Sequence, residues 1–241
     1  MTLGRQVARA LDLVREARCK LEEHLRDTDA VAVHASLDEL DEELCRLQGM
    51  CEDCDVKQSI FEIIAHVRDP EAALVQSLAY LTAHLGVDAS GLRLREGEDF
   101  PYFITNGFSK EFVAAESRLC RNDDHGQPVR DDVGRVVLEC MCGNIIQGRT
   151  DSSKPFFTAR GSFWTNSTSC LLDETTEDDR LGRTRNRCRG EGYESVALIP
   201  LRAHDETFGL LQFNDRNTGK FTPQKIALLE DLSDYLAHLL A

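Results

Sequence analysis

Two apolar runs near the end of the chain constrain the fold more than any other feature. Residues 194–201 and 208–215 are rich in aliphatic side chains, and the polar segment 202–207 separates them. Short apolar runs on either side of a polar turn are typical of paired strands. The two runs therefore predict an antiparallel strand pair.

A second strand pair is predicted earlier in the chain. Apolar and polar residues alternate over residues 89–95, and residues 101–105 follow as the partner strand. Asn106-Gly107 then marks a turn. Together the two pairs predict an antiparallel sheet in the middle and C-terminal parts of the chain.

Helices are expected on both sides of these strands, because apolar residues recur there at helical spacing. Gly49 is expected to end the second of these helices. The predicted fold class is α+β, with a helical hairpin at residues 1–56 before a domain at residues 57–241. The predicted helices cover residues 3–26, 36–48, 56–67, 70–85, 108–118 and 223–239.

The overall charge argues against nucleic acid as a partner. The 241 residues carry a formal net charge of −14, which repels phosphates. No apolar run approaches the roughly 20 residues that span a bilayer, and the first residues lack the apolar core of a signal peptide. We expect a cytoplasmic protein that binds neither nucleic acid nor membrane.

The chain is rich in cysteine, with nine in total. Thiols stay reduced in the cytosol, so metal binding, redox chemistry and simple burial are the alternatives to a disulfide framework. Cys45, Cys51 and Cys54 lie close together in the sequence and are compatible with a peripheral metal or oxidation site. Burial or exposure at a helix end explains them equally well.

A second group of cysteines is expected to converge on one pocket. These four are Cys120, Cys140, Cys142 and Cys188. Four thiolates suit zinc or an iron–sulfur cluster. Redox or catalytic thiols and plain core packing stay open beside that interpretation.

Arginines surround Cys188 in the sequence. Positive charge favours a thiolate, and guanidinium groups also bind anionic ligands. The alternative is a solvated run of surface arginines. The four are Arg183, Arg185, Arg187 and Arg189.

Aromatic and small polar residues are mixed over residues 149–169 without a clear period. Long connections of this kind often form binding loops. Trp164 and Asn166 are candidates for the pocket mouth, beside Phe163; packing in the core is the alternative for the tryptophan.

Several of these features resemble a GAF domain, a small-molecule-sensing fold, over residues 57–241. The resemblance implies a six-stranded antiparallel sheet with helices on one face and a ligand pocket on the other. It also implies a homodimer formed through the N- and C-terminal helices. The features are the helix from Asp69, the strand 91–95, Cys142-Gly143, the strands 196–201 and 208–215, and Phe221-Thr222-Pro223.

Residues 139–143 and 184–188 are similar to a sensor subgroup attached to bacterial signalling modules. That similarity implies an output through a signalling partner protein. The pocket would bind a small ligand through Trp164, Asn166, Arg187 and Arg189, or a metal or iron–sulfur centre through the four cysteines.

A second resemblance is to the free methionine-(R)-sulfoxide reductases, which are enzymes with the GAF fold. Cys188 precedes the Ile199-Pro200-Leu201 strand, and Cys142-Gly143 lies upstream, as in that family. The resemblance implies that Cys188 is the nucleophile and Cys142 resolves it by forming a disulfide. Whether the chain is an enzyme is left open, and a metal-free thiol redox switch is the third alternative.

Overall fold

The computed structural model describes residues 3–22, 30–203 and 206–240. Contacts between residues divide the chain into two units, residues 1–62 and 63–241. The predicted boundary after residue 56 stays a prediction. No helix within the described ranges has the length and apolar character that crossing a bilayer requires.

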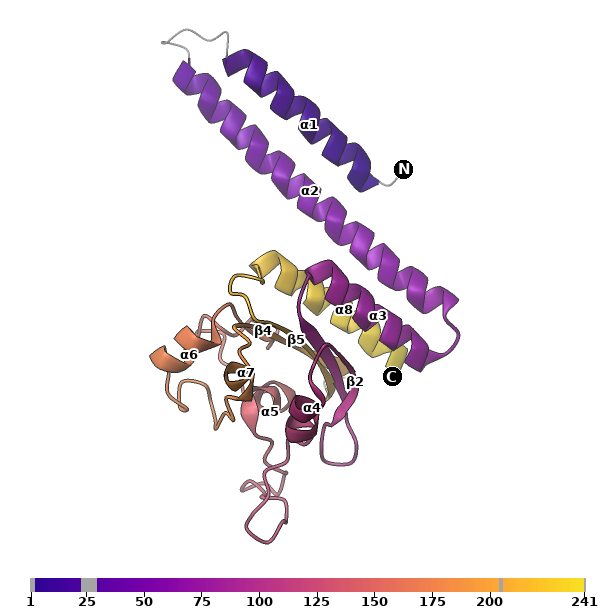
Figure 1. The fold of residues 1–241 in the computed structure, drawn as a ribbon, viewed down its shortest axis with the longest axis vertical. Coiled ribbons are helices and arrows are strands. Elements are labelled where there is room, and N and C mark those ends of the chain that lie inside the picture. Colours follow the sequence, from indigo (N-terminus) through magenta and orange to yellow (C-terminus); the bar gives the residue numbers. More distant parts are fainter. Residues whose placement is uncertain (1–2, 23–29, 204–205, 241) are drawn as a thin grey trace. The chain divides into compact units, whose positions relative to one another are not determined.

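The first unit is helical. Figure 1 shows α1 (Leu3–Glu22) and α2 (Ala30–His66) as an antiparallel pair. The expectation that Gly49 ends a helix is wrong, because α2 runs through it without a break. One glycine weakens a helix by only about 1 kcal/mol, and no proline follows to end it.

The second unit is built on one antiparallel sheet, which confirms the α+β prediction. The strand order is β2-β1-β5-β4-β3. This is a five-stranded sheet within the described residues, where the resemblance implied six. The strands are β1 (Ala89–Leu94), β2 (Tyr102–Asn106), β3 (Phe163–Thr165), β4 (Ser195–Ala203) and β5 (Glu206–Asp215).

Helices lie on both faces of this sheet (Figure 1). Helix α3 (Pro70–Leu85) contacts β1, and α8 (Pro223–Leu240) contacts β4. Helix α5 (Cys140–Ile146) contacts β4 and β5. The remaining helices of this unit are α4 (Lys110–Glu116), α6 (Thr168–Glu174) and α7 (Arg187–Gly190).

The predicted pairing of the two C-terminal apolar runs is confirmed. Strand β4 pairs with β5 from Ser195 opposite Asp215 to Ala203 opposite Glu206. Successive side chains of a strand point to opposite faces, so alternate residues of β4 and β5 face α5 and α8. Most residues of both strands are buried, because the sheet is covered on each side.

Asp99 fixes the loop between β1 and β2 to the segment that follows α4. Its carboxylate accepts hydrogen bonds from the backbone N–H groups of Phe100 at 2.8 Å, Leu119 at 2.9 Å and Cys120 at 3.2 Å. The side chain is buried. A single carboxylate thus satisfies three donors that would otherwise be buried without partners.

We predict that Asp99→Ala lowers the free energy of unfolding by about 2 kcal/mol or more, because buried donors lose their acceptor. Chemical denaturation of the purified variant measures this. Asp124→Ala, at an exposed position in the next loop, is the control and should change stability by no more than about 0.5 kcal/mol. Equal stability of the two variants would contradict the anchoring role of Asp99.

Candidate functional site

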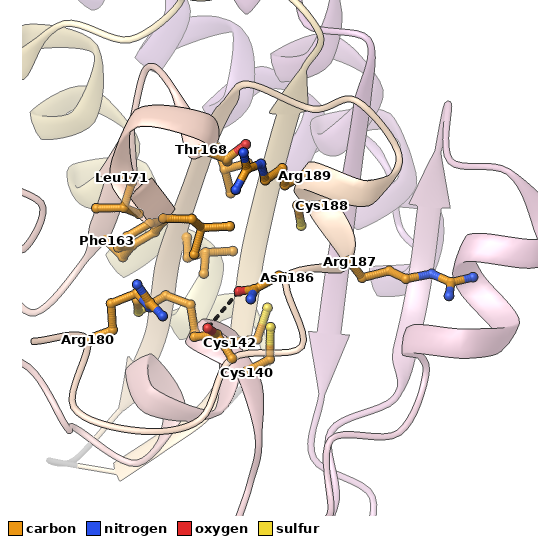
Figure 2. Close-up of a pocket in the computed structure, with 15 residues that line it drawn as sticks. Cys140, Cys142, Phe163, Thr168, Leu171, Arg180, Asn186, Arg187, Cys188 and Arg189 are labelled. Carbon is orange, nitrogen blue, oxygen red and sulfur yellow. Dashed lines mark hydrogen bonds between the residues drawn. The ribbon is translucent and has the colours of Figure 1, made fainter. Parts of the chain in front are cut away.

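Three thiols come together where α5 and α7 meet the sheet (Figure 2). Cys140 and Cys142 lie on α5, and Cys188 lies on α7. Cys140, Met141 and Cys142 are the first three residues of α5. All seven residues of α5 are buried, so no polar face marks the segment as helical in the sequence.

Gly143 is required by the close approach of α5 to the preceding chain. A Cβ atom built at this position would lie 2.7 Å from the backbone of Leu138, a separation that real side chains do not reach. The Cys142-Gly143 pair therefore has a steric reason: the glycine lets the helix sit deep enough to bring Cys142 to the sheet.

The thiols line a small cavity with mostly apolar walls. Its volume is about 60 Å³, which is room for about four water molecules. Of the described residues that line it, none is acidic. The apolar part of the wall consists of Phe163, Leu171, Leu172, Val196 and Leu198.

Backbone strain is concentrated at this cavity. Cys140, Leu181 and Asn186 are the non-glycine residues with positive φ within the described ranges, at 67°, 60° and 57°. Two of them, Cys140 and Asn186, line the cavity. Left-handed backbone at such residues costs free energy and is concentrated at functional sites. The left-handed backbone at Cys140 and Asn186 therefore shapes this cavity at some cost in the stability of the folded state.

Two polar residues of β5 lie under the thiols, and the sequence analysis assigned them no role. The amide of Gln212 is 3.8 Å from the sulfur of Cys142 and 3.9 Å from that of Cys188. It also accepts a hydrogen bond from Tyr102 and donates one to Asn214, at 2.8 and 3.0 Å. The sequence did contain a signal for them, because Gln212 and Asn214 are polar residues two positions apart in an otherwise apolar strand.

Cys140 is the thiol that the structure activates. Its pKa is lowered to about 7, chiefly because the thiol of Cys142 donates a hydrogen bond to it. Backbone N–H groups of Arg185 and Met141 lower the pKa further. The same Cys140–Cys142 hydrogen bond and burial raise the pKa of Cys142. The pair thus shares one proton, with the thiolate at Cys140.

Burial dominates at Cys188, against the expectation that nearby arginines favour its thiolate. The pKa of Cys188 is raised to about 12 because the side chain is removed from water. The four arginines of that segment pair with acidic residues instead. The pairs are Arg183–Glu139 at 3.8 Å, Arg185–Glu139 at 3.1 Å, Arg187–Glu191 at 3.6 Å and Arg189–Asp173 at 3.0 Å.

A different arginine stands in the cavity wall. Arg180 is 5% exposed, and its Nη1 donates to the backbone oxygen and the hydroxyl of Thr175 at 2.6 and 2.7 Å. Its Nε is buried without a hydrogen-bond partner. The sequence analysis gave this residue no role, because burial of a lone arginine cannot be recognised from its neighbours.

The family assignment follows from comparison with known proteins. A family model described as "GAF domain" matches residues 69–240, which is most of the chain. The chain belongs to the GAF domain family. The GAF fold is a small-ligand-sensing fold, and the thiol-lined cavity is the candidate ligand site of this member.

Solved structures similar to the chain carry the same fold. The GAF domain of a phosphoenolpyruvate-protein phosphotransferase from Coxiella burnetii has 15% identity and a TM-score of 0.56, covering 80% of this chain and 94% of its own. A putative GAF sensor protein from Burkholderia vietnamiensis has 12% identity and a TM-score of 0.53, covering 78% and 93%. At these identities the likeness shows the fold alone.

Another similar structure is an enzyme. Free methionine-R-sulfoxide reductase from Neisseria meningitidis, in complex with its substrate, has 13% identity and a TM-score of 0.54, covering 78% of this chain and 87% of its own. The curated proteins contain no significant match to the sequence.

The other predicted site residues of this GAF domain are divided between the cavity wall and positions away from it. Cys120 is not among the residues that line it; burial, with Asp99 nearby, raises its pKa to about 11. Trp164, half-buried on β3, does not line it either. Arg187 and Arg189 line its rim, and Figure 2 shows the guanidinium of Arg187 pointing away from the thiols.

Asn166 has a structural partner. Its side-chain amide donates to the backbone oxygen of Phe221 at 2.8 Å and accepts from the backbone N–H of the same residue at 2.9 Å. The side chain therefore holds the segment that enters α8, and it is outside the cavity wall.

The predicted metal centre does not fit this arrangement. Within the described residues, no three His, Cys, Asp or Glu side chains are placed to hold one metal ion. The side chains of Cys45 and Cys51 lie outside the described residues, and Cys54 is exposed on α2.

We predict that Cys142→Ala raises the pKa of Cys140 from about 7, because the thiolate loses its main hydrogen-bond donor. The rate of alkylation of Cys140 by iodoacetamide, followed across pH by peptide mass spectrometry, measures this. Cys54, exposed on α2, is the internal control. An unchanged pH midpoint for the alkylation of Cys140 would contradict the assignment of Cys142 as its hydrogen-bond donor.

The same pKa sets a pH dependence of stability. A pKa lowered on folding stabilises the folded state above the ordinary thiol pKa, and this stabilisation is lost as the pH falls through about 7. The Cys142→Ala variant should therefore lose more stability, relative to the natural protein, at about pH 8 than at about pH 6, which is below the range in which the Cys142 thiol itself ionises.

Proposed function

We propose that this GAF domain is a sensor that binds a small molecule in the cavity lined by Cys140, Cys142 and Cys188. One observation carries the proposal: a cavity whose strained backbone, buried amide network and activated thiol all converge on the same volume. Such convergence is typical of ligand and active sites.

The ligand is a small organic molecule in this proposal and not a metal or an iron–sulfur cluster. The donor set supports this choice, because Cys120 lies away from the other three thiols.

The sensor passes its signal to a partner protein, and it is a homodimer formed through its N- and C-terminal helices. The membership of the chain in the GAF domain family supports that arrangement, because the GAF resemblance implies dimers formed through these helices.

Binding in the cavity is tested with three probes of similar shape: isovalerate, isovaleramide and isopentanol. We predict that at least one shifts the NMR signals of the labelled methyl groups of Leu171, Val196 and Leu198. The methyl groups of Leu229 and Leu232, buried on α8, are the control and should not shift. No response at the cavity methyl groups to any probe would contradict the proposal.

A second candidate is a thiol reductase of free methionine sulfoxide, supported by three thiols in one cavity and the similar Neisseria meningitidis enzyme. Two thiols would supply two electrons: the sulfoxide becomes the thioether, the thiols become a disulfide, and the oxygen leaves as water. The pKa values favour Cys140 as nucleophile over the predicted Cys188. The absence of an acidic residue among the described lining residues gives the substrate's ammonium group no counter-charge, so we rank this activity second.

A single-turnover assay separates the two candidates. A reductase forms one methionine and one disulfide per chain from free methionine-(R)-sulfoxide without added reductant, and Cys140→Ser abolishes this. A sensor forms no methionine. The matched control for Cys140→Ser is Cys54→Ser, on α2, which should behave as the natural protein in either case.

A further inference from the structure

The hydroxyl groups in the wall of the thiol cavity donate their hydrogen bonds within the protein. Thr168 and Thr184 both line the cavity. The hydroxyl of Thr168 donates to the backbone oxygen of Tyr193 at 2.6 Å. The hydroxyl of Thr184 donates to the side-chain oxygen of Asn186 at 2.7 Å. Both hydroxyls therefore hold the wall together instead of pointing a donor at a ligand.

The three arginines of the wall are engaged in the same way. Arg180 is buried and donates two hydrogen bonds to Thr175. Arg187 and Arg189 form ion pairs with acidic residues outside the wall, at 3.6 and 3.0 Å. A charged or strongly polar ligand would therefore give up its hydration in this cavity and gain little in return. The cavity favours a neutral ligand that is mostly apolar.

Cys140 is the reactive group that faces this apolar space. It lines the cavity, and Figure 2 shows its side chain beside that of Cys142. The hydrogen bond that Cys142 donates is the main cause that lowers the pKa of Cys140 to about 7. A thiolate, and not a thiol, is the nucleophile, so Cys140 is prepared to attack a ligand near neutral pH.

The apolar wall also restricts the kind of reaction. A displacement at carbon would release an anion into a space that solvates it poorly, whereas addition to a carbon–carbon double bond conjugated with a carbonyl group releases nothing. In such an addition the sulfur of Cys140 bonds to the β carbon, the π electron pair moves toward the carbonyl group, and the α carbon takes up a proton. The Cys142 thiol supplies this proton and regains one from water, so nothing is oxidised or reduced.

We infer that the ligand of this sensor is a small, neutral α,β-unsaturated ketone or aldehyde, held against the aliphatic side chains of Val196 and Leu198 and captured covalently by Cys140. The inference rests on the proposed function and deepens it, because it names the class of ligand. Carboxylates, amines and amides are disfavoured, since the wall gives their polar groups no partner.

Two reagents of the same size test this inference in the natural protein. Methyl vinyl ketone and acrylamide share the reacting vinyl carbonyl group and differ only in a terminal methyl or amino group. Peptide mass spectrometry gives the rate of adduct formation at Cys140 and at Cys54. Because Cys54 is exposed on α2, its rate corrects for the different intrinsic reactivities of the two reagents.

We expect the ratio of the Cys140 rate to the Cys54 rate to be at least about ten-fold higher for the ketone than for acrylamide. The reason is that the amino group of acrylamide would be buried without a hydrogen-bond partner. An equal ratio for the two reagents, or a higher one for acrylamide, overturns the inference.

Cys140→Ser tests the residue itself. After methyl vinyl ketone has reacted and the free reagent has been removed, the NMR signals of the Val196 and Leu198 methyl groups should stay shifted in the natural protein and return to their original positions in Cys140→Ser. Cys170→Ser is the matched control, because Cys170 is exposed on α6 and is not in the cavity wall; its signals should stay shifted. Shifts that persist in Cys140→Ser overturn the assignment. If that variant does not fold, the comparison of the two reagents in the natural protein decides.

The outcomes separate this inference from the proposed function. Binding of isovalerate, isovaleramide or isopentanol in the cavity, with no adduct at Cys140, overturns the covalent capture and leaves the sensor proposal standing. Isovalerate binding more tightly than isopentanol overturns the neutral ligand and also leaves the sensor standing. Neither binding nor an adduct overturns both. Tightest binding of isopentanol, together with an adduct that favours the ketone, supports both.

Discussion

The register of β4 against β5 is the constraint on which the site depends. Strand side chains alternate between faces, so a slip of one residue exchanges the two faces of a strand. In the observed register Gln212 lies opposite Leu198, and Gln212 and Leu210 share the face that meets α5. A slip would carry the amide of Gln212 into the apolar layer under α8, where it would have no partner. The hydrogen bond that Tyr102 donates to Gln212 therefore favours this register, and the bond from Gln212 to Asn214 helps to hold the amide beside the thiols.

Burial, more than sequence proximity to charge, decides the chemistry of the thiols. Cys188 has arginines on each side in the sequence, yet burial raises its pKa, and Arg187 and Arg189 pair with acidic residues. Cys140 is buried as well, but a thiol and two backbone N–H groups donate hydrogen bonds to it and lower its pKa. A hydrogen bond to a thiolate lowers the pKa of the thiol even when the group is buried, whereas charges that are already paired change that pKa little. The two cysteines thus differ in reactivity for geometric reasons.

The sequence predicted the fold well and the site in part. Paired strands and amphipathic helices have periods that can be read from residue type, so β4, β5, α3 and α8 were found. The meeting of Cys140, Cys142 and Cys188 was also expected. Helix α5 was missed because a wholly buried seven-residue segment has no polar face. Arg180 was missed because nothing in its neighbourhood along the chain says that it is buried, and the hydrogen bonds of Asn166 to Phe221 were missed because the two residues are distant in sequence.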